Sequence, residues 1–492
     1  MKALSDYTDA HLRQFVRPPV ADRASLRSVY LIAICGTGMG SMAAMFREAG
    51  FAVSGSDEAV YPPMSERLAE LGIPVHIGFS PTNLQPHPDL VIVGNACTPT
   101  HVEAAYARDN GLPQMSFPEA LAHYFIRDRR SIVVAGTHGK TSTTGLLIHV
   151  FQTAGLDPGY LVGGVSQTGA SGQAVGTGNF FITEGDEYDS AYFDKEPKFF
   201  HYRPDVAIVT SVEFDHADIY DSIEDYTAVF ERFAAGVSKQ GRLIIWGDDP
   251  RVKSLARWAV SEVTTYGVAL ENGVRAANVV IDSEGQSFDV YSAETLVGRF
   301  KVPAWGRHNL LNTLAVVAVS VGEGIDPESI NRAFASYQGM KRRQEIRGEV
   351  SGITVVDDFA HHPTAVRETI LGIRDRWPDR RIVAIFEPRT NSSRRKVFEA
   401  PYGRALAGAD VVFLSSPPLR YNDDPADFMD AKAVVDAVNG AGVPIGVWPS
   451  PDELLGPLIS ELKTGDVVLI MSNGAVGNLH RRLLDALAAS KG

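Results

Sequence analysis

The sequence has few cysteines, no long apolar run and no excess of basic residues. Cys35 and Cys97 are its two cysteines among 492 residues, and one bond between them could not staple a chain of this size. We expect both to be buried free thiols. No apolar stretch approaches the roughly 20 residues of a membrane-spanning helix, and the polar first residues lack the apolar segment of a secretory signal. We therefore expect a cytoplasmic protein with no part in the membrane.

The charge is acidic, with 46 Lys and Arg against 59 Asp and Glu, a formal net charge of −13. This balance argues against a nucleic acid or an anionic membrane surface as partner. An anionic substrate must then be held by local cations and helix ends. The sequence shows no sign of an obligatory protein partner.

The length suggests about three domains, and the pattern suggests α/β units. Short β-branched runs alternate with helical patterns, which predicts three domains that are each a mainly parallel sheet with flanking helices. Charged, polar segments near 127–130 and 338–343 set the expected boundaries, giving domains 1–127, 128–338 and 339–492. Residues 274–302 alternate in a way that predicts an antiparallel addition to the second sheet.

The expected strands end in polar or glycine clusters in all three blocks. Open parallel sheets bind ligands outside the carboxyl ends of their strands. We therefore expect a cleft where several substrates meet.

The most informative motif is a glycine loop between an apolar run, 131–134, and a helical pattern, 145–150. Such a loop binds phosphate through backbone N–H groups and a lysine, and its threonine hydroxyl reaches Mg²⁺. It departs from the usual G-x-x-x-x-G-K-[ST] pattern because Val134 stands where the first glycine belongs. A tight turn is the alternative, but the hydroxyl-rich loop favours ATP or GTP. The residues assigned to it are Gly136, Thr137, His138, Gly139, Lys140, Thr141 and Ser142.

A second glycine loop opens the first block. Asp57, beside Ser56, follows it by about 20 residues, as in dinucleotide-binding units. Ser41 replaces the third glycine, and NAD(P) and a UDP-sugar fit equally well. Glycines that serve close packing are the alternative. The loop residues are Gly36, Thr37, Gly38, Met39 and Gly40.

Two further pairs of residues come from the second block. Glu184 and His216 end neighbouring expected strands and could complete a Mg²⁺ site with Thr141, although Mg²⁺ prefers oxygen. Solvated acids and a helix-capping His216 are an equal alternative. Asn309 and Asn312 share a helix face that could pair with adenine. Capping of the helix by Asn309 is equally compatible with the sequence.

The third block adds basic and histidine-rich segments. The run Lys341 to Arg343 is either a solvated charge run or a source of an arginine for the γ-phosphate. Residues 357–363 contain His361 and His362, which suggest a metal site. Adjacent side chains point in different directions, however, and no cysteine or clustered acid completes such a site.

With these motifs in order, the chain resembles the Mur ligase family from end to end. The resemblance implies a Rossmann-like UDP domain, a central P-loop ATPase domain and a Rossmann-like C-terminal domain that closes over ATP and binds the incoming peptide. It implies an ATP-dependent amide ligase that forms an acyl phosphate on a UDP-muramoyl acid and then a C–N bond. The motifs that carry it are 136–141, Glu184, 215–216, 306–309 with Asn312, Arg343 and 358–363.

The resemblance also implies roles for individual residues. It places Thr141, Glu184 and His216 at Mg²⁺, and Lys140, His216 and Arg343 in catalysis. It places Asn309 and Asn312 at adenine, Asp358 at ribose and Arg343 near the γ-phosphate, in addition to the phosphate loop. The first glycine loop with Ser56 and Asp57 would bind UDP-N-acetylmuramate. Where many relatives carry a modified lysine at the second Mg²⁺, the helix here offers Glu231.

Residues 186–195 and 387–391 resemble one branch of the family more closely. That branch attaches a salvaged murein tripeptide, L-alanyl-γ-D-glutamyl-meso-diaminopimelate, to UDP-N-acetylmuramate during cell-wall peptide recycling. Arg389 and Asn391 would then contact the peptide. The near alternative is a ligase for free L-alanine. More distant alternatives are a nucleotide-dependent switch and an NAD(P)-binding oxidoreductase. The general base is not identified by the sequence; His216 and His361 qualify by residue type alone.

Overall fold

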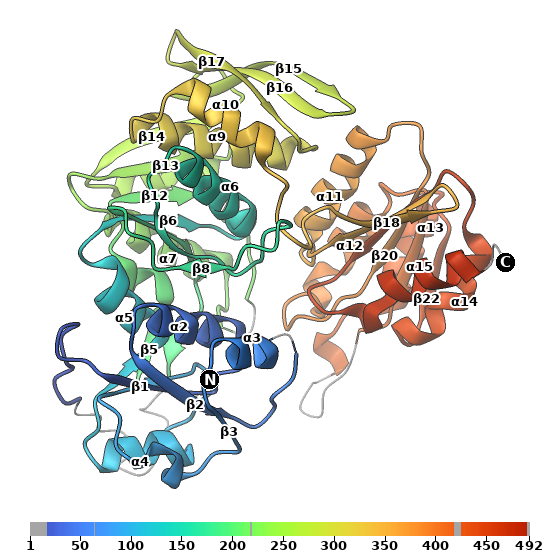
Figure 1. The fold of residues 1–492 in the computed structure, drawn as a ribbon. Coiled ribbons are helices and arrows are strands. Elements are labelled where there is room, and N and C mark those ends of the chain that lie inside the picture. Colours follow the sequence, from blue (N-terminus) through green and yellow to red (C-terminus); the bar gives the residue numbers. More distant parts are fainter. Residues whose placement is uncertain (1–16, 63, 217–218, 418–424, 490–492) are drawn as a thin grey trace.

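The structure is a computed structural model that describes residues 17–62, 64–216, 219–417 and 425–489. Residues 1–16 of the predicted first domain thus lie outside the described part. Three sheets follow one another along the chain, and the last of them stands beside the other two (Figure 1). Among the described residues, none of the helices combines the length and apolarity needed to cross a membrane.

The first sheet is parallel throughout, with strand order β3-β2-β1-β4-β5. The central strand β1 is flanked by β2 and β4, so the glycine loop after β1 opens at a point where the chain order reverses. Ligands bind at such points in open α/β sheets. The elements are β1 (Ser28–Ile32), α2 (Thr37–Glu48), β2 (Ala52–Asp57), α3 (Met64–Glu70), β3 (Val75–Ile77), β4 (Leu90–Val93), α4 (Val102–Asp109), β5 (Gln114–Ser116) and α5 (Phe117–Leu121).

The second sheet has the order β17-β16-β15-β14-β13-β12-β6-β9-β7-β8. Its middle strands are parallel, and β15 to β17 form an antiparallel extension that lies at the top of Figure 1. The strands are β6 (Arg130–Ala135), β7 (Gly159–Leu161), β8 (Gln173–Ala174), β9 (Phe180–Gly185), β12 (Val206–Val209), β13 (Arg242–Trp246), β14 (Glu262–Gly267), β15 (Val274–Asp282), β16 (Gly285–Ser292) and β17 (Thr295–Val302). A separate ribbon pairs β10 (Asp189–Ala191) with β11 (Asp194–Pro197).

Helices cover both faces of this second sheet. Side chains of α6, α9 and α10 share one apolar cluster with it, and those of α7 belong to the cluster on the other face. The helices are α6 (Lys140–Thr153), α7 (Ile223–Ala235), α8 (Pro250–Ser254), α9 (Arg307–Gly322) and α10 (Pro327–Ser336).

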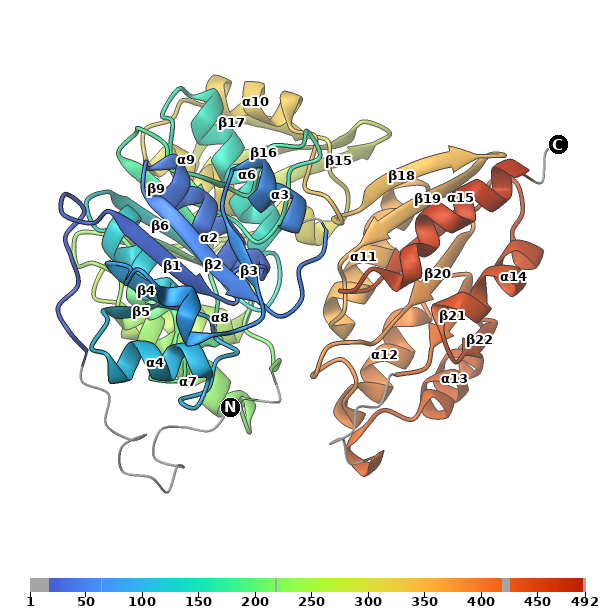
Figure 2. The ribbon, with the colours of Figure 1, turned by 60° about the horizontal axis from the view of Figure 1, so that its bottom comes forward.

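The third sheet, with order β18-β19-β23-β20-β21-β22, is parallel except for β18. Neighbouring residues of β19 face opposite sides, as a strand requires: Val355 packs toward α14 and α15, and Val356 toward α11, α12 and α13. Figure 2 shows these helices on the two sides of the sheet. The elements are β18 (Glu345–Val350), β19 (Ile353–Asp358), α11 (Pro363–Arg376), β20 (Ile382–Phe386), α12 (Glu399–Leu406), β21 (Val411–Ser415), α13 (Ala431–Gly440), β22 (Ile445–Trp448), α14 (Pro451–Glu461), β23 (Val467–Met471) and α15 (Leu479–Ala489).

The apolar cores are not divided equally. One buried cluster runs without interruption from the first sheet, with Leu31 and Phe46, into the central one, with Phe181 and Phe230. The third sheet has two clusters of its own. The first two sheets therefore form one packed body, to which the third is attached through 338–345.

Most expectations about the fold are confirmed. The chain is α/β with three mainly parallel sheets, and 274–302 is the antiparallel extension. Both cysteines are free, with Cys97 buried and Cys35 half-buried. The boundaries near 127 and 338 are consistent with the sheets but stay predictions.

Candidate active site

The phosphate loop connects β6 to α6 in a conformation that needs glycine. Gly136 has φ of 130° and Gly139, the N-cap of α6, has φ of 81°. A Cβ at Gly136 would also lie 2.2 Å from Thr210 Oγ1. Side chains other than glycine rarely adopt such φ values, so the two glycines are explained by geometry.

The loop is held in place from the segment after β12. The Thr137 amide donates to the Ser211 carbonyl (3.0 Å), and the Thr137 hydroxyl donates to the Glu213 carbonyl (3.0 Å). The His138 amide donates to Ser211 Oγ (2.9 Å). These bonds fix the loop so that the N-terminus of α6 opens into a pocket.

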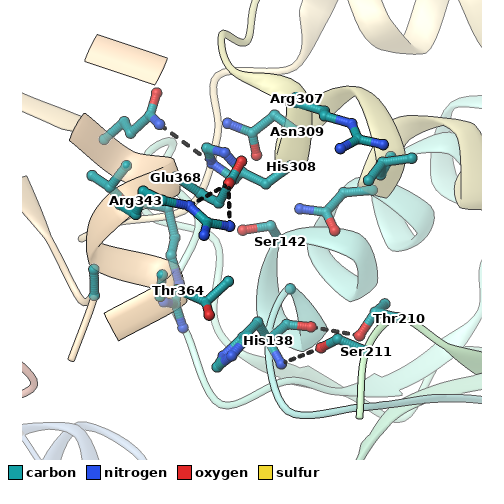
Figure 3. A pocket seen from close by; sticks show the side chains of 18 of the residues that line it. His138, Ser142, Thr210, Ser211, Arg307, His308, Asn309, Arg343, Thr364 and Glu368 are labelled. Atoms are coloured by element: carbon teal, nitrogen blue, oxygen red, sulfur yellow. Dashed lines mark hydrogen bonds and ion pairs between the residues drawn. The ribbon is translucent and has the colours of Figure 1, made fainter. Parts of the chain in front are cut away.

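That pocket, of about 210 Å³, lies between the central and C-terminal sheets. Figure 3 shows Arg343, Thr364 and Glu368 on one side and Ser142 and Asn309 on the other. Seven of the residues assigned to ATP from the sequence line it: His138, Gly139, Ser142, Asn309, Asn312, Arg343 and Asp358.

Behind the loop, Lys140 is paired with an acid that sequence reasoning did not select. Its Nζ donates to Glu187 Oε2 (2.9 Å) and to the Gly136 carbonyl (2.7 Å). The Glu187 side chain is 0% exposed and also accepts from His216 Nε2 (2.9 Å) and the Tyr226 hydroxyl (2.8 Å). One buried carboxylate thus joins the predicted catalytic residues Lys140 and His216.

The charges of this cluster support one another. Burial lowers the pKa of Lys140, but the bond to Glu187 and the negative charges of Glu187, Asp186 and Glu184 together outweigh it, and the net pKa is raised. Burial likewise lowers the pKa of His216, but its bond to Glu187 and the charges of Glu187 and Asp215 together outweigh that effect and the net pKa is raised. Burial raises the pKa of Glu187, but the charge of Lys140 and the bond to His216 bring the net pKa below its usual value. The cluster is therefore a mutually stabilised set of ionic groups.

Glu184 and Thr141 lie at the entrance to the loop with Arg343. Glu184 Oε1 accepts from the Gly163 amide (3.0 Å), and Arg343 Nη2 donates to Thr141 Oγ1 (3.2 Å). Burial raises the pKa of Glu184, and the charges of Lys140 and Arg343 offset this only in part. This carboxylate with incomplete charge compensation, beside a hydroxyl, is a suitable place for a hard cation.

Two of the alternatives considered for the sequence are wrong. His216 does not cap α7, because Ser222 is the N-cap of that helix. Asn309 does not cap α9, because the N-cap is Gly306 and the side-chain Nδ2 of Asn309 donates to the Trp305 carbonyl (2.8 Å).

Asn312, one turn further along α9, places its amide against Gly139. A Cβ on that glycine would lie 2.5 Å from Asn312 Oδ1. The two asparagines therefore line the pocket beside the phosphate loop, where a base could be recognised.

The segment that joins the central and C-terminal sheets is not a solvated charge run. Arg342 donates to the carbonyls of Ser472 (2.6 Å) and Gly474 (2.6 Å), while Arg343 points into the pocket. The Gln344 amide donates to Asp358 Oδ2 (2.8 Å). Burial raises the pKa of Asp358, opposed by the charge of Arg343.

A second cluster lies at the edge of the pocket. Glu213 Oε2 is 3.3 Å from His138 Nε2 and 3.5 Å from His362 Nδ1, and it accepts from Thr364 Oγ1 (2.6 Å). The expectation that no acid joins His362 is therefore wrong, because the acid comes from a segment about 150 residues away. Sequence reasoning missed Glu213 as well as Glu187.

The glycine loop of the first domain begins α2, whose N-cap is Gly36. Asp57 accepts from the amide of Cys35 in that loop (2.9 Å), which joins the ends of β1 and β2. The hydroxyl of Ser56 points away, however, and donates to the buried Glu103. Met39 is buried in the core, so its side chain faces away from a ligand.

The predicted peptide residues lie in the loop after β20. Arg389 is exposed and lies against Gly474 in the loop after β23. The two are so close that a Cβ added to Gly474 would lie 2.4 Å from Arg389 Nη1. Asn391 accepts from the buried Arg394 (3.5 Å). Glu231, the expected substitute at a second metal, pairs instead with Arg257 (3.1 Å).

Family models match all three parts of the chain. Residues 28–129 match the Mur ligase family catalytic domain, residues 134–320 the Mur ligase middle domain, and residues 342–474 the Mur ligase glutamate ligase domain.

Named relatives are ligases of two kinds. The chain is 36% identical over 463 residues to the UDP-N-acetylmuramate–L-alanyl-γ-D-glutamyl-meso-2,6-diaminoheptandioate ligase of Escherichia coli, covering 94% of this chain and 98% of the relative. It is 38% identical over 392 residues to the UDP-N-acetylmuramate–L-alanine ligase of Leuconostoc mesenteroides, covering 79% and 84%. The crystal structure of a murein peptide ligase from Psychrobacter arcticus superposes with a TM-score of 0.70 at 32% identity, covering 94% and 98%. The chain belongs to the Mur ligase family of enzymes.

Proposed function

We propose that this protein is an ATP-dependent ligase that joins L-alanyl-γ-D-glutamyl-meso-diaminopimelate to UDP-N-acetylmuramate. The observation that carries the reaction type is the contact of Arg343, from the segment leading into the C-terminal sheet, with Thr141 of the phosphate loop. Closing of the third sheet on the second thus adds a cation at the place where the γ-phosphate is expected. The choice of substrates rests on the relatives that match the chain almost over its full length.

In this proposal the muramoyl carboxylate attacks the γ-phosphate, ADP leaves, and an acyl phosphate forms. The free amine of the tripeptide then attacks the acyl carbon, and phosphate leaves as the amide forms. Lys140 and Arg343 reduce the repulsion between the two reacting anions. Activation is needed because a carboxylate at neutral pH is a poor acyl donor, and closing of the C-terminal sheet over the pocket during the reaction would keep water from the acyl phosphate.

The arrangement of Thr141 and Glu184 fits Mg²⁺, which prefers oxygen ligands. When bound, Mg²⁺ would neutralise phosphate charge. His216 is assigned to the metal by resemblance alone, because its Nε2 is bonded to Glu187. Asn309, Asn312 and Asp358 would hold the nucleoside, while the loop 36–40 with Asp57 would hold the UDP portion and Arg389 with Asn391 the peptide.

A comparison of amine substrates tests the proposal. Ligation is measured with UDP-N-acetylmuramate, ATP and Mg²⁺, and with either the tripeptide or L-alanine as the amine. We expect ADP release to require both the UDP-sugar and the amine, and kcat/KM to be more than about a hundredfold higher for the tripeptide, a difference of about 3 kcal/mol in transition-state binding. The same assay with Lys140→Ala is the control for ATP-dependent turnover.

The second candidate function is ligation of free L-alanine, favoured by the relative that is 38% identical. Equal or better use of L-alanine would establish it in place of the tripeptide activity. ADP release that needs no amine would instead contradict both. The named relatives are all ligases, which leaves the switch and oxidoreductase alternatives without support.

A further inference from the structure

Three potential metal ligands from distant parts of the chain meet at the junction of the central and C-terminal sheets. His138 belongs to the phosphate loop, Glu213 follows β12, and His362 is the N-cap of α11. Their ligand atoms all lie within 4.8 Å of one another. This set is separate from Thr141 and Glu184, the oxygen ligands considered for Mg²⁺.

Two of the three distances between ligand atoms in the set match tetrahedral coordination, and the third lies within 4.8 Å. Zinc binds imidazole nitrogen and carboxylate oxygen at about 2.1 Å, so neighbouring ligand atoms of a tetrahedral site lie about 3.4 Å apart. Glu213 Oε2 is 3.3 Å from His138 Nε2 and 3.5 Å from His362 Nδ1. An ion could therefore contact all three with small adjustments of the side chains.

The orientation of His362 is also that of a metal ligand. Its Nε2 is 3.3 Å from the Phe214 carbonyl, and its Nδ1 accepts from the Thr364 amide (3.3 Å). A histidine that donates one ring nitrogen to a backbone carbonyl can bind a metal through the lone pair of the other nitrogen, and an ion bound to His362 would replace the bond from the Thr364 amide. Here that second nitrogen is the one that faces Glu213.

The surroundings favour a cation and give it access. Asp215, which is buried, adds a second carboxylate in the electrostatic surroundings of His362. His138 and Glu213 line the open pocket, so an ion can enter from it and keep a water as its fourth ligand. Two nitrogens and one oxygen favour Zn²⁺ or Co²⁺, whereas Mg²⁺ prefers an all-oxygen shell.

We propose that His138, Glu213 and His362 form a binding site for a borderline transition-metal ion, of the Zn²⁺ class, that fastens the C-terminal sheet to the central one. Because two ligands come from the central part and one from α11, the ion binds tightly only when the two parts are together. The site needs neither ATP nor ligation, so its test is independent of the function proposed above.

Metal titration tests the site directly. The full-length protein is stripped with a chelator and titrated with Co²⁺ in excess Mg²⁺, with the visible spectrum and the bound metal measured, and then with Zn²⁺ in competition. We expect one equivalent with the intense absorption of a low-coordinate Co²⁺ centre, displaced by Zn²⁺. His362→Asn, which keeps a good N-cap residue, and Glu213→Gln should each weaken binding by more than about tenfold. The neighbouring His361→Asn should bind as the parent does.

Trypsin digestion tests the fastening. Lys341, Arg342 and Arg343 offer cleavage sites in the connecting segment. Zn²⁺ should slow cleavage there in the parent and in His361→Asn, but not in His362→Asn, with circular dichroism confirming that each variant is folded. The proposed site would be overturned if no Co²⁺ remained bound in excess Mg²⁺, or if all variants bound Co²⁺ with the same affinity. Binding that leaves the cleavage rate unchanged would overturn the fastening role.

Discussion

Replacing Glu187 by glutamine tests the cluster behind the phosphate loop. The substitution keeps the shape and an oxygen acceptor but removes the negative charge that Lys140 and His216 share. In the parent, Lys140 Nζ lies 2.9 Å from this carboxylate, and the side chain of Lys140 is 17% exposed. The variant therefore leaves a nearly buried ammonium group without its bonded counter-charge, so that Asp186 and Glu184 are the acids that still act on it.

The size of the effect follows from that burial. Removing one partner of a fully buried ion pair costs about 3–5 kcal/mol of unfolding free energy. Lys140 keeps its bond to the Gly136 carbonyl, so we expect the lower end, about 3 kcal/mol. Lys140→Met alone should cost about 2 kcal/mol, because the protonated His216 still compensates Glu187. If the two effects were independent, the double variant Lys140→Met/Glu187→Gln would lose about 5 kcal/mol of unfolding free energy. We expect a loss of about 3 kcal/mol instead, because neither charge of the pair is then left without its partner.

The assay is denaturant unfolding of the four proteins at neutral pH, monitored by tryptophan fluorescence. In parallel, NMR titration of labelled histidine should show that the pKa of His216 falls in Glu187→Gln, because the bond and charge that raise it are gone while its burial remains. If the loss of unfolding free energy in the double variant equalled the sum of the two single losses to within about 0.5 kcal/mol, the pairing of Lys140 with Glu187 would be refuted. An unchanged His216 titration would refute the assigned cause of its pKa.

Three further predictions concern the ligands and pH. Lys140→Ala should reduce ATP-dependent ligation more than about a hundredfold and leave UDP-N-acetylmuramate binding nearly unchanged in calorimetry; near-normal turnover would contradict the role of the loop. Asp57→Ala, which removes the acceptor of the Cys35 amide, should weaken UDP-N-acetylmuramate about tenfold with ATP affinity unchanged; equal loss of both would contradict the division of the sites. Burial lowers the pKa of His308 from 6.5 to about 4. As the pH falls from 6.5 to 4, the unfolded chain therefore binds a proton at this residue before the folded protein does, and the folded state loses stability over this range. Since the ring is half-buried, we expect a loss of about 2 kcal/mol between pH 6.5 and 4 that His308→Gln abolishes; identical acid profiles of unfolding would disprove this.

The sequence predicted the sheets well because their signals are local. The apolar run 132–134 became the centre of β6, and the alternating segment 274–302 became three antiparallel strands. The glycine loops were recognisable for the same reason, since positive φ at Gly136 and Gly139 requires glycine whatever the surroundings.

Partners distant along the chain were not predictable in the same way. Glu187 looked like one of several acids after β9, and only the fold brings it to Lys140, 47 residues earlier. Glu213 meets His362 across the junction of two sheets for the same reason. Ser56 alternates with Asp57 along β2, so the strand that offers one carboxylate to the glycine loop turns the neighbouring hydroxyl inward.

The unequal sharing of apolar cores has a consequence for how such enzymes diversify. Because the first two sheets are built around one continuous interior and the third keeps its own, the segment from about 345 onward can be exchanged as a cassette without rebuilding the interior of the rest. On the proposed placement of the peptide at Arg389 and Asn391, a chimera carrying that segment from an L-alanine-specific relative should inherit the donor's choice of amine, which the ligation assay with both amines would check.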